Sequence, residues 1–150
     1  MQTIQFTIPG NHEASDGHPV PYERSTQAGF WKPRVRRYSA WKDYVRSHFD
    51  RHTRLYGLPV IISDDGKAGA LLTNGRQLKP IQTKRKCRMD IFITYKNHAH
   101  PDSDNVWKGI ADALFYNDKN VAGSFDFTVD SKAKPGVKVT ITIPTNEGPK

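Results

Sequence analysis

The residues best suited to chemistry in this chain are three aspartates, Asp102, Asp104 and Asp118, together with Lys108. Asp102 and Asp104 are separated by one residue, where a polar loop enters a segment with helical spacing, and Asp118 follows that segment. Their carboxylates can therefore converge around the helix ends. Hard oxygen ligands of this kind suit Mg²⁺, which keeps several waters for a substrate phosphate. The pattern predicts a magnesium site for phosphate chemistry.

The same residues also have other interpretations. Asp is a preferred N-cap, and Asp104 and Lys108 have the i, i+4 spacing of a common surface ion pair. His98 and His100 stand close to the Asp pair, so a Zn²⁺ site is an alternative, although no further His or Cys completes the usual ligand spacing. Asp112, one turn after Lys108, is expected to pair with Lys108 rather than to touch metal.

The charge distribution favours an anionic partner. The formal net charge is +8 at pH 7, yet residues 99–130 hold six Asp against two Lys, a local net charge of −4. Such a patch repels phosphates unless a divalent cation neutralises it, which favours a nuclease over a passive binder. Basic stretches can also serve solubility or bind anionic membranes. The candidate DNA-binding residues are Arg24, Lys32, Arg34, Arg36, Arg37, Lys84, Arg85 and Lys86.

The order of the expected elements indicates a small α+β domain. Alternating apolar residues predict strands at 4–8, 89–95, 124–129 and 137–143. Helical spacing predicts helices at about 39–54, with Ser39 as N-cap, and at about 104–114, and residues 34–38 are expected as a short strand or a lead-in. Residues 11–33 and 55–84 are expected to be loop or hairpin excursions, and the tail after 144 to be frayed.

This order of elements, β, α, β, α, β, β, predicts one domain over residues 1–150, with two main helices packed on a mixed β-sheet. His48 and His52, four residues apart on the first helix, could bind metal, but they share a face with aromatic residues and are expected to pack. Cys87 is the single cysteine, and no apolar run marks a signal peptide or a membrane span. We therefore expect a cytoplasmic protein that does not contact membranes.

Residues 100–121 carry a recognisable pattern. The run HPDSDNVWKGIADAL at 100–114, followed by NDKNV at 117–121, resembles the signature stretch of the RusA family of Holliday junction resolvases. The family pattern is Asp-x-Asp-Asn, a Lys four residues after the second Asp, Asp-Ala-Leu, and then an acidic turn before a hydrophobic strand. The chain departs from it at Pro101, where members often have Arg, and at Asn117, where a second acidic residue is common.

The resemblance implies a RusA-like fold and a Mg²⁺-dependent endodeoxyribonuclease, with Mn²⁺ as a substitute cation. It implies that Asp102, Asp104 and Asp118 ligate the metal and that Lys108 assists at the scissile phosphate. The implied substrate is branched DNA, a four-way junction cut by paired incisions that leave 5′-phosphate and 3′-hydroxyl ends, in a bacterium or its phage. Paired incision favours a homodimer, because a two-fold dimer presents two equivalent sites to two-fold related strands.

Two other functions fit the same sequence. A non-catalytic protein of this fold could hold branched DNA, with the Asp cluster reduced to capping and solubility. A nuclease of the same chemistry could act on flaps or replication forks rather than on four-way junctions.

Overall fold

The structure is a computed structural model, and it describes residues 2–10, 17–24, 32–55, 87–115 and 121–143. The chain forms β1 (Gln2–Pro9), α1 (Pro33–Leu55), β2 (Cys87–Tyr95), α2 (Ser103–Leu114), β3 (Val121–Val129) and β4 (Gly136–Ile143). The predicted α+β class and the predicted order of elements are confirmed. Residues 17–24 have no regular secondary structure, as expected. The predicted excursions over 11–33 and 55–84 are wrong at their edges, because Pro33 and Leu55 are the ends of α1. Residues 56–84 and the tail after 144 lie outside the described residues.

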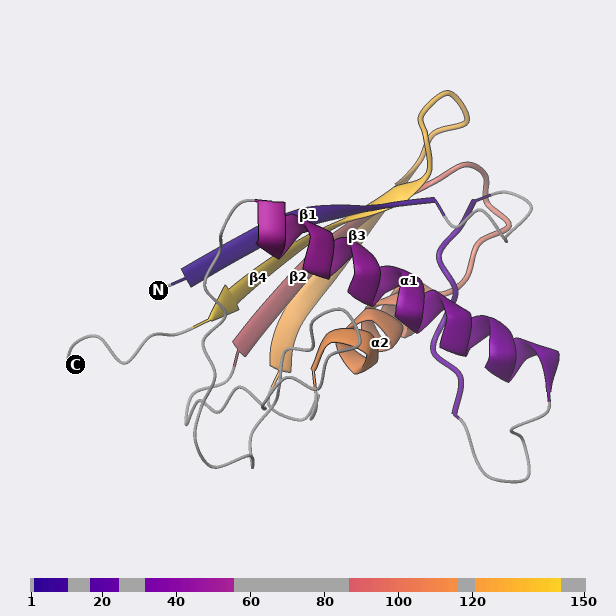
Figure 1. Ribbon diagram of the computed structural model, residues 1–150. Coiled ribbons are helices and arrows are strands. Elements are labelled where there is room, and N and C mark those ends of the chain that lie inside the picture. Colours follow the sequence, from indigo (N-terminus) through magenta and orange to yellow (C-terminus); the bar gives the residue numbers. More distant parts are fainter. Residues whose placement is uncertain (1, 11–16, 25–31, 56–86, 116–120, 144–150) are drawn as a thin grey trace.

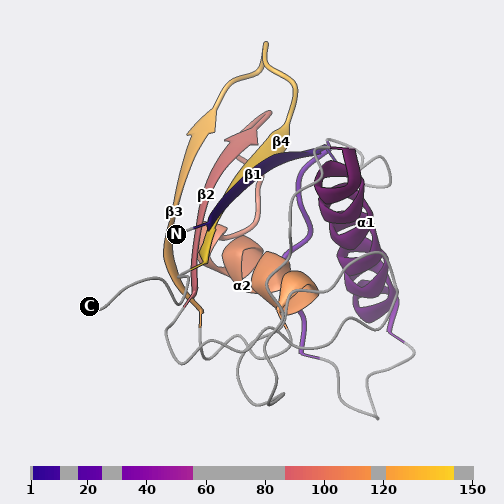
Figure 2. The same cartoon turned by 60° about the vertical axis from the view of Figure 1, so that its left-hand side comes forward.

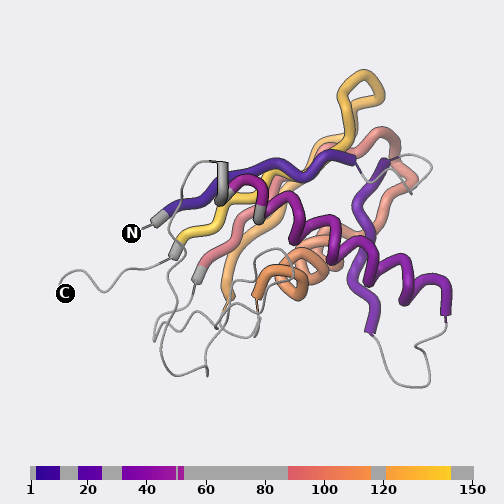
Figure 3. Tube along the Cα trace, viewed as in Figure 1, coloured from indigo at the N-terminus to yellow at the C-terminus, as the bar shows by residue number. Residues whose placement is uncertain are grey.

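The strands form one mixed sheet in the order β1-β4-β2-β3, and both helices lie on the same face of it (Figure 1, Figure 2). β4 is antiparallel to β1 and to β2, whereas β3 is parallel to β2. A parallel pair needs a crossover connection, and α2 lies in the crossover from β2 to β3. The loop that leads from β2 into α2 and the β3–β4 hairpin lie at the same end of the sheet (Figure 3).

The core lies between this sheet and the two helices. Alternation along the strands puts one row of each inner strand against the helices, and the opposite row faces solvent. The buried sheet residues are Ile4, Phe6, Ile8, Met89, Ile91, Ile93, Tyr95, Val121, Val137, Val139 and Ile141. The helices contribute Tyr38, Trp41, Val45 and Phe49 from α1 and Val106, Ile110, Ala113 and Leu114 from α2.

The first helix begins earlier than predicted. It starts at Pro33, so the expectation that Ser39 caps it is wrong, and Ser39 is an exposed residue inside the helix. Proline suits the first helical turn, because its fixed φ is helical and its missing N–H has no partner there. The N–H of Val35 donates to the carbonyl of Lys32 at 3.0 Å. Val35 and Tyr38 are both buried, so the apolar stripe begins one turn before the predicted start.

Strand β3 begins at Val121, three residues before the predicted start at 124. Gly123 explains how it can approach β2 so closely. A Cβ added at Gly123 would overlap the carbonyl oxygen of Met89, so this position accepts only glycine without movement. The indole of Trp107 donates to the same Met89 carbonyl at 2.8 Å. Trp107 thereby fixes α2 to the start of β2.

Candidate active site

Asp102 occupies the N-cap position of α2, but its side chain makes no capping hydrogen bond. Its backbone carbonyl accepts hydrogen bonds from the N–H groups of Asn105 and Val106, each at 3.1 Å. The extended backbone of Asp102, with φ −62° and ψ 132°, carries the chain from the loop into the helix. Capping therefore does not account for this carboxylate, which remains exposed at the helix start.

Asp104 and Lys108 lie on the exposed side of α2, as the helical spacing predicts. The Lys108 Nζ atom is 3.8 Å from Asp104 Oδ2, and both side chains are about half exposed, at 54% and 51%. The expected i, i+4 surface pair is therefore present. An exposed pair of this kind contributes little to stability, typically less than about 1 kcal/mol. Both groups consequently remain accessible to a ligand.

Tyr95 holds the chain on both sides of Asp102. Its hydroxyl lies 3.2 Å from the carbonyl oxygen of Pro101, to which it donates, and 3.1 Å from Ser103 Oγ. Ser103 is 7% exposed, although it stands between two exposed aspartates. Burial raises the pKa of Tyr95, the hydrogen bond with Ser103 lowers it, and the charge of Asp102 raises it, with a net upward shift. The hydroxyl therefore keeps its proton at neutral pH.

Aromatic rings border the loop beside Asp102. The His100 ring stacks on Tyr95 with centroids 3.8 Å apart and an interplanar angle of 5°. The ring of Phe127, on the edge strand β3, is 5.2 Å from His100 and 5.6 Å from Tyr95. His100 Nδ1 is 2.9 Å from the carbonyl oxygen of Pro101. His100 therefore has a packing role next to the candidate site.

His18, in the segment 17–24, contacts the start of the loop between β2 and α2. His18 is buried, and its Nε2 atom accepts a hydrogen bond from the backbone N–H of Lys96 at 2.9 Å. Its ring also meets the Tyr95 ring in a T-shaped contact at 5.2 Å. A residue far away in the sequence thus fixes the start of the loop that carries Asp102.

The donor chemistry at the start of α2 fits Mg²⁺. Asp102 and Asp104 supply hard carboxylate oxygens at neighbouring exposed positions. Among the described residues, no group of three or more His, Cys, Asp or Glu side chains is placed to hold a metal ion. Asp118, the third predicted ligand, lies within 116–120, outside the described residues. The structure therefore describes two of the three predicted ligands, Asp102 at the N-cap and Asp104 in the first turn of α2, and pairs Asp104 with Lys108.

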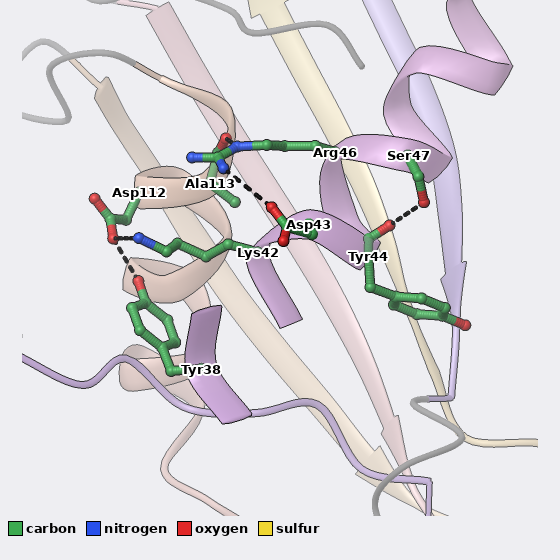
Figure 4. A network of polar contacts seen from close by, with 8 residues as sticks. All are labelled: Tyr38, Lys42, Asp43, Tyr44, Arg46, Ser47, Asp112 and Ala113. Atoms are coloured by element: carbon green, nitrogen blue, oxygen red, sulfur yellow. Dashed lines mark hydrogen bonds and ion pairs between the residues drawn. The ribbon is translucent and has the colours of Figure 1, made fainter. Parts of the chain in front are cut away.

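Asp112 contacts α1 and not Lys108, so the expected pairing with Lys108 is wrong. Figure 4 shows its Oδ2 atom accepting from the Tyr38 hydroxyl at 2.6 Å and from Lys42 Nζ at 3.3 Å. The Lys42 ammonium also lies 4.9 Å from the Tyr38 ring centroid. Burial and the carboxylate of Asp112 both raise the pKa of Tyr38. These contacts hold α2 against α1 and thereby fix the direction in which its start points.

Two cations of α1, Lys42 and Arg46, have structural contacts. Besides the Lys42–Asp112 pair, Arg46 Nε donates to the carbonyl oxygen of Ala113 at 2.7 Å, near the C-terminal end of α2 (Figure 4). A cation is favourable there, because the last carbonyls of a helix are unsatisfied. Lys42 and Arg46 therefore stabilise the helix pair, which their charge alone did not indicate.

The described candidates for DNA binding cluster around the start of α1. Four lie on or next to its first turns, and all five side chains are exposed: Arg24, Lys32, Arg34, Arg36 and Arg37. Arg34 Nε lies 3.7 Å from Glu23 Oε2, a loose pair at the surface. Lys84, Arg85 and Lys86 lie outside the described residues.

His48 and His52 have ring contacts that agree with packing. The His48 ring meets Tyr44 in a T-shaped contact at 4.5 Å, and the His52 ring is 6.1 Å from Phe6. In the described part of the chain, neither histidine belongs to a group of three or more potential metal ligands.

The comparisons leave the family open. The chain matches no protein-family model, and no curated protein matches it significantly. Neither of the two described helices is long and apolar enough to cross a membrane. The resemblance to the RusA family therefore rests on the sequence motif at residues 100–121.

Proposed function

We propose that this chain is a Mg²⁺-dependent endodeoxyribonuclease of the RusA type that cuts branched DNA. One observation supports this most strongly: the carboxylate of Asp102 stands at the N-cap of α2 without capping it, and the helix that it precedes carries the exposed Asp104–Lys108 pair. A carboxylate that does not cap its helix and an exposed carboxylate paired with an ammonium group suit metal-assisted phosphate chemistry. Asp118 is the third proposed ligand.

The proposed chemistry assigns a task to each residue. Asp102, Asp104 and Asp118 would hold Mg²⁺ or Mn²⁺, and the bound cation would acidify a water and polarise the phosphoryl oxygens. Lys108 offsets the negative charge that builds on the phosphate as the bond to the leaving oxygen breaks. Tyr95 acts through Pro101 and Ser103 and keeps Asp102 in place.

The proposed substrate is a four-way junction, and the proposed active form is a homodimer in the cytoplasm of a bacterium or a phage-infected bacterium. The exposed cations at the start of α1 would bind the phosphate backbone and release its counterions. Light scattering tests the dimer directly. A mass near the 17.0 kDa of one chain, unchanged by junction DNA, would contradict paired incision by a dimer.

The function is tested by a cleavage assay on a panel of four-way junction, fork, flap and linear duplex, each with Mg²⁺ and with EDTA. We expect the junction to be cut at two symmetric positions, and only with the metal. Faster cutting of the fork or flap would keep the chemistry and change the substrate. Tight junction binding without cleavage in Mg²⁺ or Mn²⁺ would show a non-catalytic DNA-binding protein instead.

A further inference from the structure

Phe92 is a large apolar side chain on the open face of the sheet. It is 43% exposed, although β2 is an inner strand with β4 on one side and β3 on the other. Its neighbours Ile91 and Ile93 are buried on the face that carries both helices. Phe92 therefore points to the opposite face, which no described helix covers (Figure 2). An exposed aromatic ring in the middle of a sheet suits a binding surface.

A hollow of about 350 Å³ lies beside the Phe92 ring, on the side of β1 and β4. Thr7 and Thr94 are among the residues that line it, and Lys134 and Lys138 supply its charge. Lys138 is the direct cross-strand neighbour of Phe92. Within the described residues, neither lysine forms an ion pair. The hollow thus combines an accessible aromatic ring with two lysines that have no acidic partner in the described part of the chain.

The charge around Phe92 is uneven. On the β3 side its cross-strand neighbour is Asp126, an exposed acidic residue whose Oδ1 atom accepts from the N–H of Phe127. The β1 and β4 side carries Lys134 and Lys138 instead. A polyanion is therefore attracted to the hollow and repelled from the β3 edge of this face.

We propose that this hollow binds an unpaired nucleotide of the DNA substrate, with the base stacked on Phe92 and the backbone phosphates held by Lys134 and Lys138. Stacking on an exposed ring combined with a basic groove is the general way in which proteins hold single strands. The inference rests on the proposed function for the identity of the polymer. The described residues that line the hollow include Lys134 and Lys138 and no acidic side chain, which suits the phosphates of a nucleotide, and a second copy of the chain is one of the outcomes that the test below distinguishes.

The hollow and the candidate active site lie at the same end of the sheet, on opposite faces. Thr94 lines the hollow, and the loop that follows Tyr95 carries the chain to Asp102. The β3–β4 hairpin, which holds Lys134, lies at that end too (Figure 3). A strand whose bases open at a branch point can therefore pass over this end of the sheet. One of its nucleotides would then lie in the hollow while another part of the strand lies at the candidate active site. This would give the enzyme a preference for branched over linear duplex DNA.

The test measures binding of a labelled 12-nucleotide oligothymidylate by fluorescence anisotropy in EDTA, so that it does not depend on cleavage. Phe92→Ala should bind about 5- to 150-fold more weakly, the range expected for the loss of one stacked base. Phe92→Tyr keeps the ring and should bind within about twofold of the wild type. Lys138→Gln should make the slope of log K against log[salt] shallower by about 0.7, the value for one phosphate contact to a single strand.

Phe125→Ala is the matched control, because Phe125 is 47% exposed but pairs with the buried Ile91 and so lies on the helix face. Its affinity should match that of the wild type. Equal losses in Phe92→Ala and Phe125→Ala, or wild-type binding by Phe92→Ala, would overturn the proposal. A light-scattering change from dimer to monomer in Phe92→Ala, with unchanged oligonucleotide affinity, would assign the face to a second copy instead.

Two further results keep the test decisive. If Phe92→Ala does not fold by circular dichroism, Phe92→Thr replaces it, since threonine suits a half-exposed strand position. A wild-type protein that cuts no DNA, yet binds the oligonucleotide through Phe92, would remove the nuclease proposal and leave this one standing. A wild-type protein that cuts junctions, with binding independent of Phe92, would do the reverse.

Discussion

Replacing Tyr95 with Phe removes one hydroxyl group that holds both flanks of Asp102. The change leaves the carbonyl of Pro101 without this donor at 3.2 Å and the buried Ser103 Oγ without this partner at 3.1 Å. A typical hydrogen bond contributes about 0.5–1.5 kcal/mol, and a buried group left without a partner costs about 1–3 kcal/mol. We therefore expect Tyr95→Phe to lower the free energy of unfolding by about 1–3 kcal/mol.

Urea or thermal unfolding of the purified variant measures this loss. For a chain of 150 residues each kcal/mol corresponds to about 2–4 °C, so Tm should fall by roughly 2–12 °C. Junction cleavage should slow by about tenfold or more, because a small displacement of Asp102 misaligns the site. Junction binding in EDTA should stay unchanged.

Ser103→Ala and the double variant complete a double-mutant cycle. Because the two hydroxyl groups contact each other, the double variant should be more stable than the sum of the single losses predicts, by about 0.5 kcal/mol or more. Additive losses within about 0.3 kcal/mol would show that the two hydroxyl groups are not coupled. A stable Tyr95→Phe protein with wild-type cleavage would refute the positioning role of Tyr95.

Three other substitutions test separate parts of the structure. Lys108→Ala should slow single-turnover cleavage by about 10²- to 10³-fold while the urea midpoint hardly changes, and wild-type cleavage would leave Lys108 as a surface partner of Asp104. If six phosphates are contacted, log K for junction binding against log[salt] should have a slope of about −5. Replacing both Arg36 and Arg37 with Gln should make this slope shallower by about 2, and an unchanged slope would exclude the start of α1 from the interface. Gly123→Ala should lower the free energy of unfolding by about 2–4 kcal/mol, since β2 and β3 must separate, and wild-type stability in thermal unfolding would contradict the close approach to Met89.

Regular periodicity explains which elements were predictable. Alternation over 89–95 and 137–143, and the helical spacing over 104–114, each describe an element with one buried face, so the pattern and the structure agree. The start of α1 was misplaced because its first turn holds mostly charged residues and so shows little apolar periodicity. That turn opens with Pro33, which is well suited to the first position of a helix. The start of β3 was misplaced because Gly123 interrupts the alternation, although close packing against β2 requires it.

The candidate site was predictable where neighbours in the sequence determine it. Asp104 and Lys108 are close because they lie one turn apart on one helix, and Asp102 immediately precedes that helix. Contacts between distant residues gave no such signal: His18 reaches Lys96, and Asp112 pairs with Lys42 of the other helix rather than with its own neighbour. Alternation did place Tyr95 on the buried face, but its hydrogen bonds depend on the path of the loop that follows.

The most direct test of the metal site compares Asp104→Asn with wild type in single-turnover junction cleavage with Mg²⁺ and in gel-shift binding with EDTA, on the same preparations. Asp43→Asn is the matched control, because it removes an exposed carboxylate of α1 far from the motif in the sequence. An amide oxygen is a weaker Mg²⁺ ligand than a carboxylate, and the loss of one negative charge reduces repulsion of the phosphates. We predict that Asp104→Asn abolishes cleavage and binds the junction as tightly as wild type or slightly more tightly, whereas Asp43→Asn cuts normally. Junction cleavage by Asp104→Asn at the wild-type rate would contradict the assignment of Asp104 as a metal ligand.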